Sequence, residues 1–449
     1  MKTGLGLHNQ DTEAPVSLVK WKYEKNAVAE AIELCDGFKN LDPNMKVLIK
    51  PNLVSWVDKY RFAPFGVLTT SVVLEGLVRA LKDFGVGDIT IAEGSARQEE
   101  MGSETYIIYE RLNYAYLSKQ YGVRLVDLNQ EDHVRTALGP FTLRIAKRVL
   151  DAEFMINVPV LKTHNATKIS MGFKNLKGCL AQSSKKACHN PDHPVDEYLV
   201  ELGSRLYPHL VVTDGIYAME RGPMYTGHAH RTDLVMASRD MFSNDCVGAT
   251  LVGFQPEQIG HLKGFAGRNG RSLSVDDIEV RGLNPAECAL QLEYDTPWST
   301  DGLVPQIFEK QGIGGFQMRN PGQSMCTGCS KVFPAVLVML LGAYEGKPFD
   351  NFEILSGKAM RPSGTAKTTI FMGDCNYAIN RNAEGVQKGV WLKGCPPRID
   401  ETIRIFNEQL GVKLKEENNA RFFAHKVKVY DKLGYPYSDY YFDSTEKKP

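Results

Sequence analysis

Short runs of β-branched residues alternate with longer amphipathic stretches in the first half of the chain. Residues 47–49 and 89–92 form two apolar runs of strand length. Between them, Val73, Leu77 and Ala80 recur on one face of a helical pattern. This order predicts a strand, a helix and a second strand, as in a βαβ unit.

The same alternation continues for about two hundred residues. A helical pattern spans about 104–120, and further apolar runs predict strands at 124–127, 154–160, 210–213 and 234–238. Strands that alternate with helices favour a parallel sheet covered on both faces. We therefore predict an α/β fold, with a doubly wound, mainly parallel sheet domain over residues 1–285.

The pattern breaks at about residues 283–325, which are rich in proline, glycine and glutamine. Beyond this break, strands are predicted at 352–355, 369–372 and 390–392, and helices at about 331–343 and 398–410. Residues 286–449 are thus predicted to form a second, smaller α/β domain.

Composition and charge narrow the class of protein. Of the 449 residues, 43% are apolar and 24% are charged, as in globular proteins. Lysine plus arginine and aspartate plus glutamate number 53 each, so no global field favours nucleic acid. The longest apolar run, residues 335–342, is too short to span a membrane, and no apolar signal core is evident. We expect a cytoplasmic protein with no membrane insertion.

Polar clusters follow four of the predicted strands, at residues 50–52, 93–95, 162–164 and 214–215. Because ligands of open α/β sheets bind where strands end, we expect a shared cleft. Ammonium and imidazole groups there would hold the phosphate or carboxylate of a small anionic molecule. The residues predicted to bind it are Lys50, Asn52, Glu93, Lys174 and Asn175, and those predicted to be catalytic are Lys162, His164 and Asp214.

Each of these residues also has a structural interpretation. A single lysine such as Lys174 is often a solvated surface group, and a lone histidine such as His164 often serves packing. Asp214 in the sequence TDG could brace a turn. The cleft is therefore predicted from the set of clusters, because each cluster alone would be an ordinary loop.

A divalent metal is a further hypothesis for this half of the chain. Carboxylates near predicted strand or helix ends could bind a hard cation or act as general bases, and Asp245 could instead cap a helix. His228 and His230 have ligand-like spacing, but a glycine-rich loop is the alternative. Cys179, Cys188, His189 and His193 could form another site, although a flexible loop over 181–194 is favoured. The carboxylates concerned are Glu93, Asp214, Glu220, Asp240 and Asp245.

Four cysteines in the second domain form a different pattern. Cys326 and Cys329 are a CxxC pair before a helix, whereas Cys375 and Cys395 each follow a predicted strand. In a parallel sheet these strand ends would share one edge, so four thiolates could meet, as one 4Fe–4S cluster requires. A four-cysteine zinc site usually shows two CxxC pairs, and a thioredoxin-like disulfide would explain only two thiols, but both stay open as alternatives. Cys35, Cys246 and Cys288 are predicted to be small buried or half-buried residues.

Two resemblances follow from these motifs. Residues 46–282 resemble the domain-of-unknown-function family numbered 362 through the start of a helix at Thr69 and Thr70 and through VLIKPNLV, IAEGS, YGVRLVDLN, NVPVLKTH, GFKNLKGCL, VVTDGIYAMERGP and ASRDMFSNDCVG. Members of that family often carry iron–sulfur ligands. The sequences CTGCS, GDC and GCPP resemble the proximal-cluster cysteines of nickel–iron hydrogenase small subunits and of the related subunit of respiratory complex I, although the intervals between them are shorter here. This second resemblance implies a flavodoxin-like half-domain in which Cys326, Cys329, Cys375 and Cys395 bind one 4Fe–4S cluster.

Three functions are compatible with these features. The first is an iron–sulfur oxidoreductase that passes electrons between the cluster and a small anionic substrate. The second is a non-redox, metal-dependent isomerase or lyase in which the cluster only braces the fold. The third is an electron carrier or assembly factor that docks on a larger redox complex, and it implies a redox partner protein.

Overall fold

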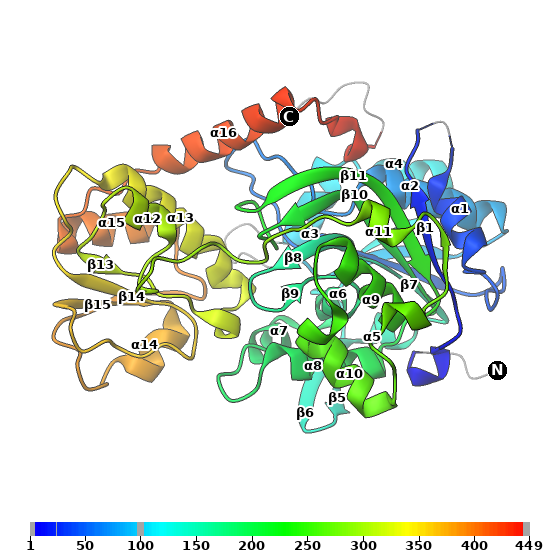
Figure 1. Cartoon of the computed structure of the whole chain (residues 1–449), viewed down its shortest axis with the longest axis horizontal. Coiled ribbons are helices and arrows are strands. Elements are labelled where there is room, and N and C mark those ends of the chain that lie inside the picture. Colours follow the sequence, from blue (N-terminus) through cyan, green and yellow to red (C-terminus); the bar gives the residue numbers. More distant parts are fainter. Residues whose placement is uncertain (1–4, 24, 97–102, 443–449) are drawn as a thin grey trace.

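The computed structural model describes residues 5–23, 25–96 and 103–442, and it arranges them in two α/β units (Figure 1). The larger unit contains a ten-stranded sheet, and the smaller unit contains a four-stranded sheet. A separate hairpin of β5 (His133–Leu138) and β6 (Phe141–Ala146) projects from the larger unit. The predicted α/β fold with a mainly parallel sheet is confirmed.

The large sheet follows the order β12-β1-β11-β10-β7-β2-β3-β4, and β8 pairs with both β10 and β9. The neighbours from β10 to β4 are parallel, whereas β11 is antiparallel to β10 and β1. The strands are β1 (Val16–Lys20), β2 (Val47–Pro51), β3 (Ile89–Glu93), β4 (Arg124–Asp127), β7 (Phe154–Val158), β8 (Val160–His164), β9 (Lys168–Ile169), β10 (Leu210–Glu220), β11 (His228–Ser238) and β12 (Val280–Gly282).

Helices cover both faces of this sheet because each strand sends alternate side chains to opposite sides. Phe154, Ile156 and Val158 pack in one core and Met155 packs in the other. The first core includes α1 (Ala27–Leu34), α2 (Ser71–Asp83), α3 (Glu104–Arg111) and α4 (Ala115–Tyr121). The second includes α5 (Lys147–Leu150), α6 (Gly172–Asn175), α8 (Val195–Arg205), α9 (Met241–Leu251) and α10 (Gly260–Asn269). The sheet is therefore doubly wound.

Several predicted elements have different bounds in the structure. The single helix predicted over 104–120 is divided into α3 and α4, because Asn113 has a left-handed φ of 57° that ends the first helix. The strand predicted over 154–160 is divided into β7 and β8 at Pro159, which has no N–H to donate. The loop predicted over 181–194 contains α7 (Gln182–Ala187), and His228 and His230 lie in β11 rather than in a loop.

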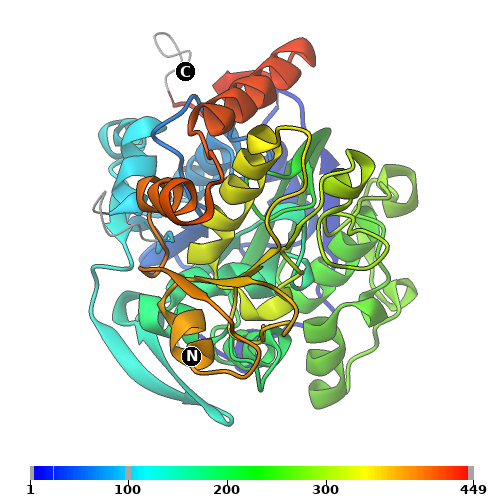
Figure 2. The ribbon, with the colours of Figure 1, turned by 90° about the vertical axis from the view of Figure 1, so that its left-hand side faces the viewer.

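The smaller unit has four parallel strands that follow the order of the chain, seen at the front of Figure 2. They are β13 (Phe316–Gln317), β14 (Phe352–Leu355), β15 (Thr368–Met372) and β16 (Gly389–Leu392). The core on one face contains α12 (Gln306–Lys310), α13 (Thr327–Ala343) and α15 (Ile399–Leu410), and α14 (Asp374–Asn380) packs on the other face. The predicted strands and helices here are confirmed, and the flavodoxin-like comparison stays a prediction.

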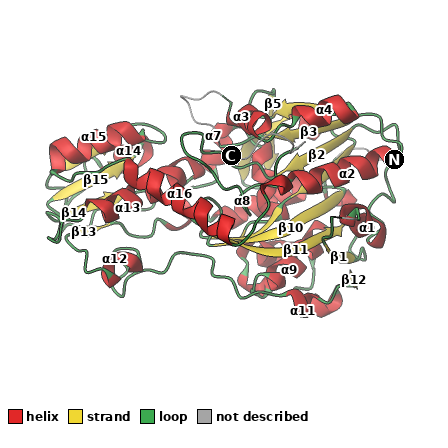
Figure 3. Cartoon of the chain, turned by 90° about the horizontal axis from the view of Figure 1, so that it is seen from above, coloured by secondary structure: helices red, strands yellow, loops and turns green. Residues whose placement is uncertain are grey.

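The last helix connects the two units. After the small unit, α16 (Glu417–Lys432) runs back over the large unit, as Figures 1 and 3 show. Phe423, Val427 and Tyr430 of α16 are buried in the core that contains α1 and α2. The predicted domain boundary at 285/286, which stays a prediction, falls in α11 (Pro285–Cys288), and this helix packs against α9 of the large unit. In the described ranges, no helix has both the length and the apolar content to cross a bilayer.

Candidate functional site

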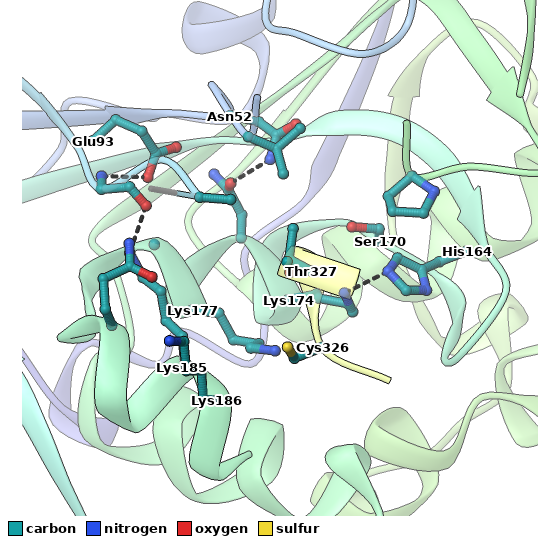
Figure 4. A pocket seen from close by; sticks show the side chains of 18 of the residues that line it. Asn52, Glu93, His164, Ser170, Lys174, Lys177, Lys185, Lys186, Cys326 and Thr327 are labelled. Carbon is teal, nitrogen blue, oxygen red and sulfur yellow. Dashed lines mark hydrogen bonds between the residues drawn. The ribbon is translucent and has the colours of Figure 1, made fainter. Parts of the chain in front are cut away.

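A cavity of about 110 Å³ lies where the two units meet, and Figure 4 shows its lining. Lys50, Glu93 and Lys162 line it from the large unit, and Cys326 and Cys395 line it from the small unit. This space is larger than one water requires. The lysine cleft and two of the predicted cluster cysteines therefore belong to one site.

The floor of the cavity is a buried network at the carboxyl ends of β2 and β3. The Lys50 ammonium donates to Glu93 Oε2 at 2.9 Å and to Asn175 Oδ1 at 3.2 Å. Asn52 Nδ2 also donates to Asn175 Oδ1, at 3.0 Å. Lys50 and Glu93 thus neutralise each other, and they line the cavity as a rigid pair rather than as free charges.

Lys162 on β8 is a second buried ammonium at this floor. It donates to Asn52 Oδ1 at 2.5 Å and to the Val67 carbonyl at 3.0 Å. Burial lowers the pKa of Lys162 to about 7, because no carboxylate makes a direct contact that offsets its desolvation. An anion bound in the cavity would favour the protonated, positively charged form of Lys162.

Asp214 does not line the cavity, so the geometry gives no support to its predicted catalytic role. Its carboxylate accepts hydrogen bonds from the backbone N–H groups of Thr70, at 2.6 Å, and Ile216, at 3.1 Å. Burial raises the pKa of Asp214 to about 6. Asp214 therefore braces the start of α2, as its structural interpretation supposed.

The wall of the cavity carries His164 and Lys174, whose side chains meet in Figure 4. His164 Nε2 lies 2.7 Å from Lys174 Nζ, and His164 Nδ1 accepts the N–H of Ala166 at 2.9 Å. Burial, and then the charge of Lys174, lowers the pKa of His164 well below its usual value. Both residues line the cavity, as predicted.

Lys177 forms the corresponding pair with His189. The Lys177 Nζ to His189 Nε2 distance is 2.8 Å, and His189 Nδ1 lies 2.7 Å from the Gln323 carbonyl of the small unit. Figure 4 shows Lys177 and Cys326 pointing toward one another. Burial lowers the pKa of Lys177, and the negative charge of Cys326 partly opposes this shift. His189 is therefore a hydrogen-bonding partner of Lys177 and not a free metal ligand.

Charge in the cavity is strongly unbalanced. Among its described lining residues, only Glu93 carries a carboxylate, whereas the lining has six lysines: Lys50, Lys162, Lys174, Lys177, Lys185 and Lys186. Buried cations need a compensating charge, and the Lys50 ammonium contacts the Glu93 carboxylate, whereas the hydrogen bonds of Lys162 and Lys177 are to amide, carbonyl and imidazole groups. The arrangement suits an anionic ligand.

Lys185, Lys186 and Gln182 were missed in the sequence analysis because they lie in the stretch predicted as a loop. They belong to α7, and Lys185 donates to the Gly94 carbonyl at 2.6 Å and to Asn129 Oδ1 at 2.9 Å. The run QSSKKA at residues 182–187 has helix-compatible residues, and this local propensity was the available signal.

The four predicted ligand cysteines gather at the carboxyl edge of the small sheet. Cys326 is the N-cap of α13, Cys375 lies in the first turn of α14, and Cys395 follows β16. The side-chain hydrogen bond with Cys326 and burial both raise the pKa of Cys329, and the negative charges of Cys375 and Cys395 raise it further. All four sulfurs therefore lie within electrostatic range, and all are free thiols.

Cys326 is the most acidic of these thiols. Its pKa is lowered to about 5 by the Cys329 thiol and by the amides of Cys329 and Gly328 at the start of α13. Gly373 has a φ of 89°, a conformation that favours glycine, and it lies beside the Cys329 sulfur. The loops thus present a compact group of thiols, one of them a stabilised thiolate.

The four cysteines are a donor set that either zinc or an iron–sulfur cluster can use, because both bind thiolates. Among the described residues, no group of three or more Cys, His, Asp or Glu side chains surrounds a single ion position. Each cysteine of a 4Fe–4S cluster binds a different iron, so the four sulfurs need not converge on one point. The 4Fe–4S cluster and the zinc alternative both stay predictions.

The five carboxylates considered for a divalent metal make separate contacts. Glu93 pairs with Lys50, and Glu220 accepts from His230 and from the Glu293 amide. Asp240, rather than Asp245, caps α9, because its side chain accepts the Ser243 amide. Asp245 lies within α9 and accepts the amides of Gly172 and Phe173 at 2.9 and 3.0 Å, which positions α6. The additional metal stays a prediction.

The remaining cysteines are packed in the cores. Cys35 lies in the first core of the large unit, and Cys179, Cys188 and Cys246 lie in the second. Cys288 is half-buried against the second core. The prediction that Cys35, Cys246 and Cys288 are buried or half-buried is confirmed, and Cys179 and Cys188 are buried as well.

Comparison with known proteins identifies the segment that carries the lysine cavity. The family model described as Domain of unknown function (DUF362) matches residues 47–250. This segment is similar to the DUF362 family. The match extends from β2 to α9 and includes all the cavity lysines, whereas the four ligand cysteines lie beyond it. The first predicted resemblance is confirmed, and the hydrogenase-like cysteine pattern stays a prediction.

Two individual proteins resemble the chain. The thylakoid-associated protein sll1697 of Synechocystis sp. (strain ATCC 27184 / PCC 6803 / Kazusa) is 29% identical over 276 residues, which cover 59% of this chain and 77% of that protein. The lactate racemase apoprotein from Thermoanaerobacterium thermosaccharolyticum aligns with 11% identity and a TM-score of 0.36, over 54% of this chain and 57% of that one. The second match spans little more than half of the racemase chain and is too weak to bear on function.

Proposed function

We propose that the protein is an iron–sulfur oxidoreductase that exchanges electrons with a small anionic substrate at the junction of its two units. The observation that carries this proposal is that Cys326 and Cys395 line the same cavity as Lys162 and Lys174. A substrate held by the lysines would therefore lie next to the cysteine group. This juxtaposition joins the two predicted sites into one.

The cysteines would hold the cluster, and the lysines would hold the substrate. Cys326, Cys329, Cys375 and Cys395 provide the four thiolates of one 4Fe–4S cluster, which when bound accepts or donates single electrons. Lys177 places a positive charge beside Cys326 and favours the anionic thiolate. Lys162 and Lys177 favour a carboxylate or phosphate on the other side of the cavity.

A second groove supports a role for a redox partner protein. It is lined by Cys395, Tyr60, Lys393, Arg398 and Phe423, among other residues, so Cys395 borders both the cavity and this groove. A partner that docks there would approach the cysteines without blocking the lysines. We retain the cytoplasm as the proposed compartment.

Metal and sulfide analysis tests the proposal directly. Anaerobically purified protein should contain iron and acid-labile sulfide, about four of each per chain, with a visible absorbance that dithionite bleaches. Cys395→Ser should lose iron and absorbance, whereas Cys288→Ser, at a half-buried thiol far along the chain, should retain both. Colourless protein with zinc on these thiols and no sulfide would overturn the proposal.

The non-redox isomerase or lyase is a second candidate because of the Lys174–His164 pair. This pair lies in the cavity and could move protons without any electron transfer. Turnover that is unchanged when the cluster is reduced, together with lower stability of Cys375→Ser, would favour this candidate. Turnover that depends on the redox state would favour the oxidoreductase.

A further inference from the structure

Two lysines that line the cavity, Lys174 and Lys177, each pair with a histidine, and the two pairs have nearly equal lengths but opposite hydrogen-bond directions. Lys174 Nζ lies 2.7 Å from His164 Nε2, and Lys177 Nζ lies 2.8 Å from His189 Nε2. In a neutral imidazole one ring nitrogen donates and the other accepts, so the partner of each Nδ1 decides the role of each Nε2. The two Nδ1 partners differ.

In the second pair, His189 must accept from its lysine. Its Nδ1 lies 2.7 Å from the carbonyl oxygen of Gln323, which can only accept, so Nδ1 carries the proton. Nε2 is then an acceptor, and the Lys177 ammonium donates to it. Lys177 is therefore compatible with its ordinary charged form.

In the first pair, His164 must donate to its lysine. Its Nδ1 accepts the backbone N–H of Ala166 at 2.9 Å, so the ring proton of the neutral imidazole is on Nε2. An ammonium has three donors and no acceptor, and two donors would then face each other at 2.7 Å. Only a neutral amine, which has a lone pair, completes this hydrogen bond.

The surroundings of Lys174 favour the same form. Burial, and then the charges of Lys177 and Lys162, lowers the pKa of Lys174 well below its usual value. Asp196 acts in the opposite direction, but its carboxylate is engaged with His261 and Gln323. The Lys174 side chain is half-buried and lines the cavity, so its amine can meet a ligand there.

We infer that Lys174 is the nucleophile of this cavity and forms an imine with the carbonyl carbon of a small anionic aldehyde or ketone. The amine lone pair forms the C–N bond, the carbonyl C–O bond breaks, and the oxygen leaves as water with the two hydrogens of the amine. The neighbouring ammonium groups of Lys162 and Lys177 would hold the carboxylate or phosphate of the same molecule. This inference rests on the proposed anion site, but it does not require the cluster.

Reductive trapping tests the inference on the full-length protein. Glyoxylate, a small anionic aldehyde, is added with cyanoborohydride, which reduces an imine to a stable secondary amine, and the labelled lysines are mapped by mass spectrometry. Lys174 should be labelled at least about tenfold faster than the exposed Lys413, because each unit of pKa depression raises the neutral fraction tenfold. Excess inorganic phosphate should slow the labelling of Lys174 and leave that of Lys413 unchanged.

The variants show whether fast labelling of Lys174 reflects a neutral amine or only the accessibility of its side chain. Lys174→Met should remove the fast label, whereas Lys367→Met, at a side chain that is 62% exposed and lies outside the cavity lining, should leave the label on Lys174 unchanged. His164→Ala, which removes the donor that requires a neutral amine, should slow the labelling of Lys174. Should Lys174 in the folded wild-type protein label no faster than Lys413, the inference is overturned even if the variants fail to fold.

The labelling experiment also distinguishes a failure of the nucleophile inference from a failure of the proposed function. The Cys395→Ser variant should lack iron but retain the fast label on Lys174. Protein with iron and sulfide but no fast label would overturn only the nucleophile. Fast labelling without iron in the wild-type protein would overturn only the oxidoreductase.

Discussion

Individual lysines in the cavity differ in the groups that face them. Lys50 contacts the carboxylate of Glu93, whereas Lys162 and Lys185 donate to neutral amide and carbonyl oxygens. Burial therefore lowers the pKa of Lys162 to about 7 and that of Lys185 to about 8. These residues are poised to gain charge when an anion arrives.

Lys162 should make the stability of the protein depend on pH. The unfolded lysine has a pKa near 10.5, so between about pH 7 and 10 the unfolded chain binds more protons than the folded chain, and stability rises with pH. Lys162→Met should reduce this slope by about 1.4 kcal/mol per pH unit, the value for one proton. Urea unfolding between pH 7 and 9 measures it.

The exposed Lys413 provides the control for this prediction. Its side chain is 70% exposed, so Lys413→Met should leave the slope unchanged. Equal slopes for wild type and Lys162→Met would show that Lys162 is fully charged in the folded protein.

At the scale of elements, short helices set the walls of the cavity. The α6 helix carries Lys174 and Asn175, and its first two amides bond to Asp245 of α9. A Cβ at Gly172 would lie 2.7 Å from Asp245 Oδ1, so glycine is needed for this close approach. The buried carboxylate thus fixes the element that carries the proposed nucleophile.

Asp245→Ala should loosen α6. It leaves two amides without an acceptor, so we expect a loss of about 1–3 kcal/mol in the free energy of unfolding. The fast glyoxylate label on Lys174 should decrease at the same time. The exposed Glu257 is the control, and Glu257→Ala should change stability by less than about 0.5 kcal/mol. If labelling were unchanged in a destabilised Asp245→Ala protein, Asp245 would not be what positions Lys174.

At the scale of the whole molecule, a few buried contacts hold the two units together. Lys331 of α13 forms an ion pair with Glu104 of α3, and both side chains are buried. The Gln323 side chain accepts the Val195 amide at 2.7 Å, while its carbonyl contacts His189. These contacts position Cys326 against the lysines, so the site depends on how the units dock.

Breaking the Glu104–Lys331 pair should destabilise the protein. Glu104→Gln leaves a buried ammonium without its counter-charge, so we expect a loss of about 3 kcal/mol. The exposed pair of Glu345 and Lys413 is the matched control, and Glu345→Gln should cost less than about 1 kcal/mol. Urea unfolding checks both. The double variant Glu104→Gln/Lys331→Met should regain part of the lost stability. If Glu104→Gln and Glu345→Gln reduced the free energy of unfolding equally, the buried pair would have no special role.

The fold was largely predictable because burial leaves a periodic trace in the sequence. The strands at residues 47–49, 89–92 and 124–127 have apolar runs that match β2, β3 and β4 closely. Deviations occurred where one backbone detail overrides the pattern, as with Asn113 between α3 and α4 and Pro159 between β7 and β8. The helix α7, with Lys185, lacks a strong apolar face and was predicted as a loop.

The sequence by itself determined which segments become strands and helices, and which lysines, histidines and cysteines follow their ends, because these features depend on local patterns of side chains. Only the tertiary structure decided that Lys162 and Cys395 share one cavity and that Asp214 lies outside it. It also decided that His164 donates where His189 accepts, since each direction depends on a particular backbone group beside the ring. Residues more than two hundred positions apart in the sequence meet only because the two units dock, and no local sequence pattern encodes their closeness in space.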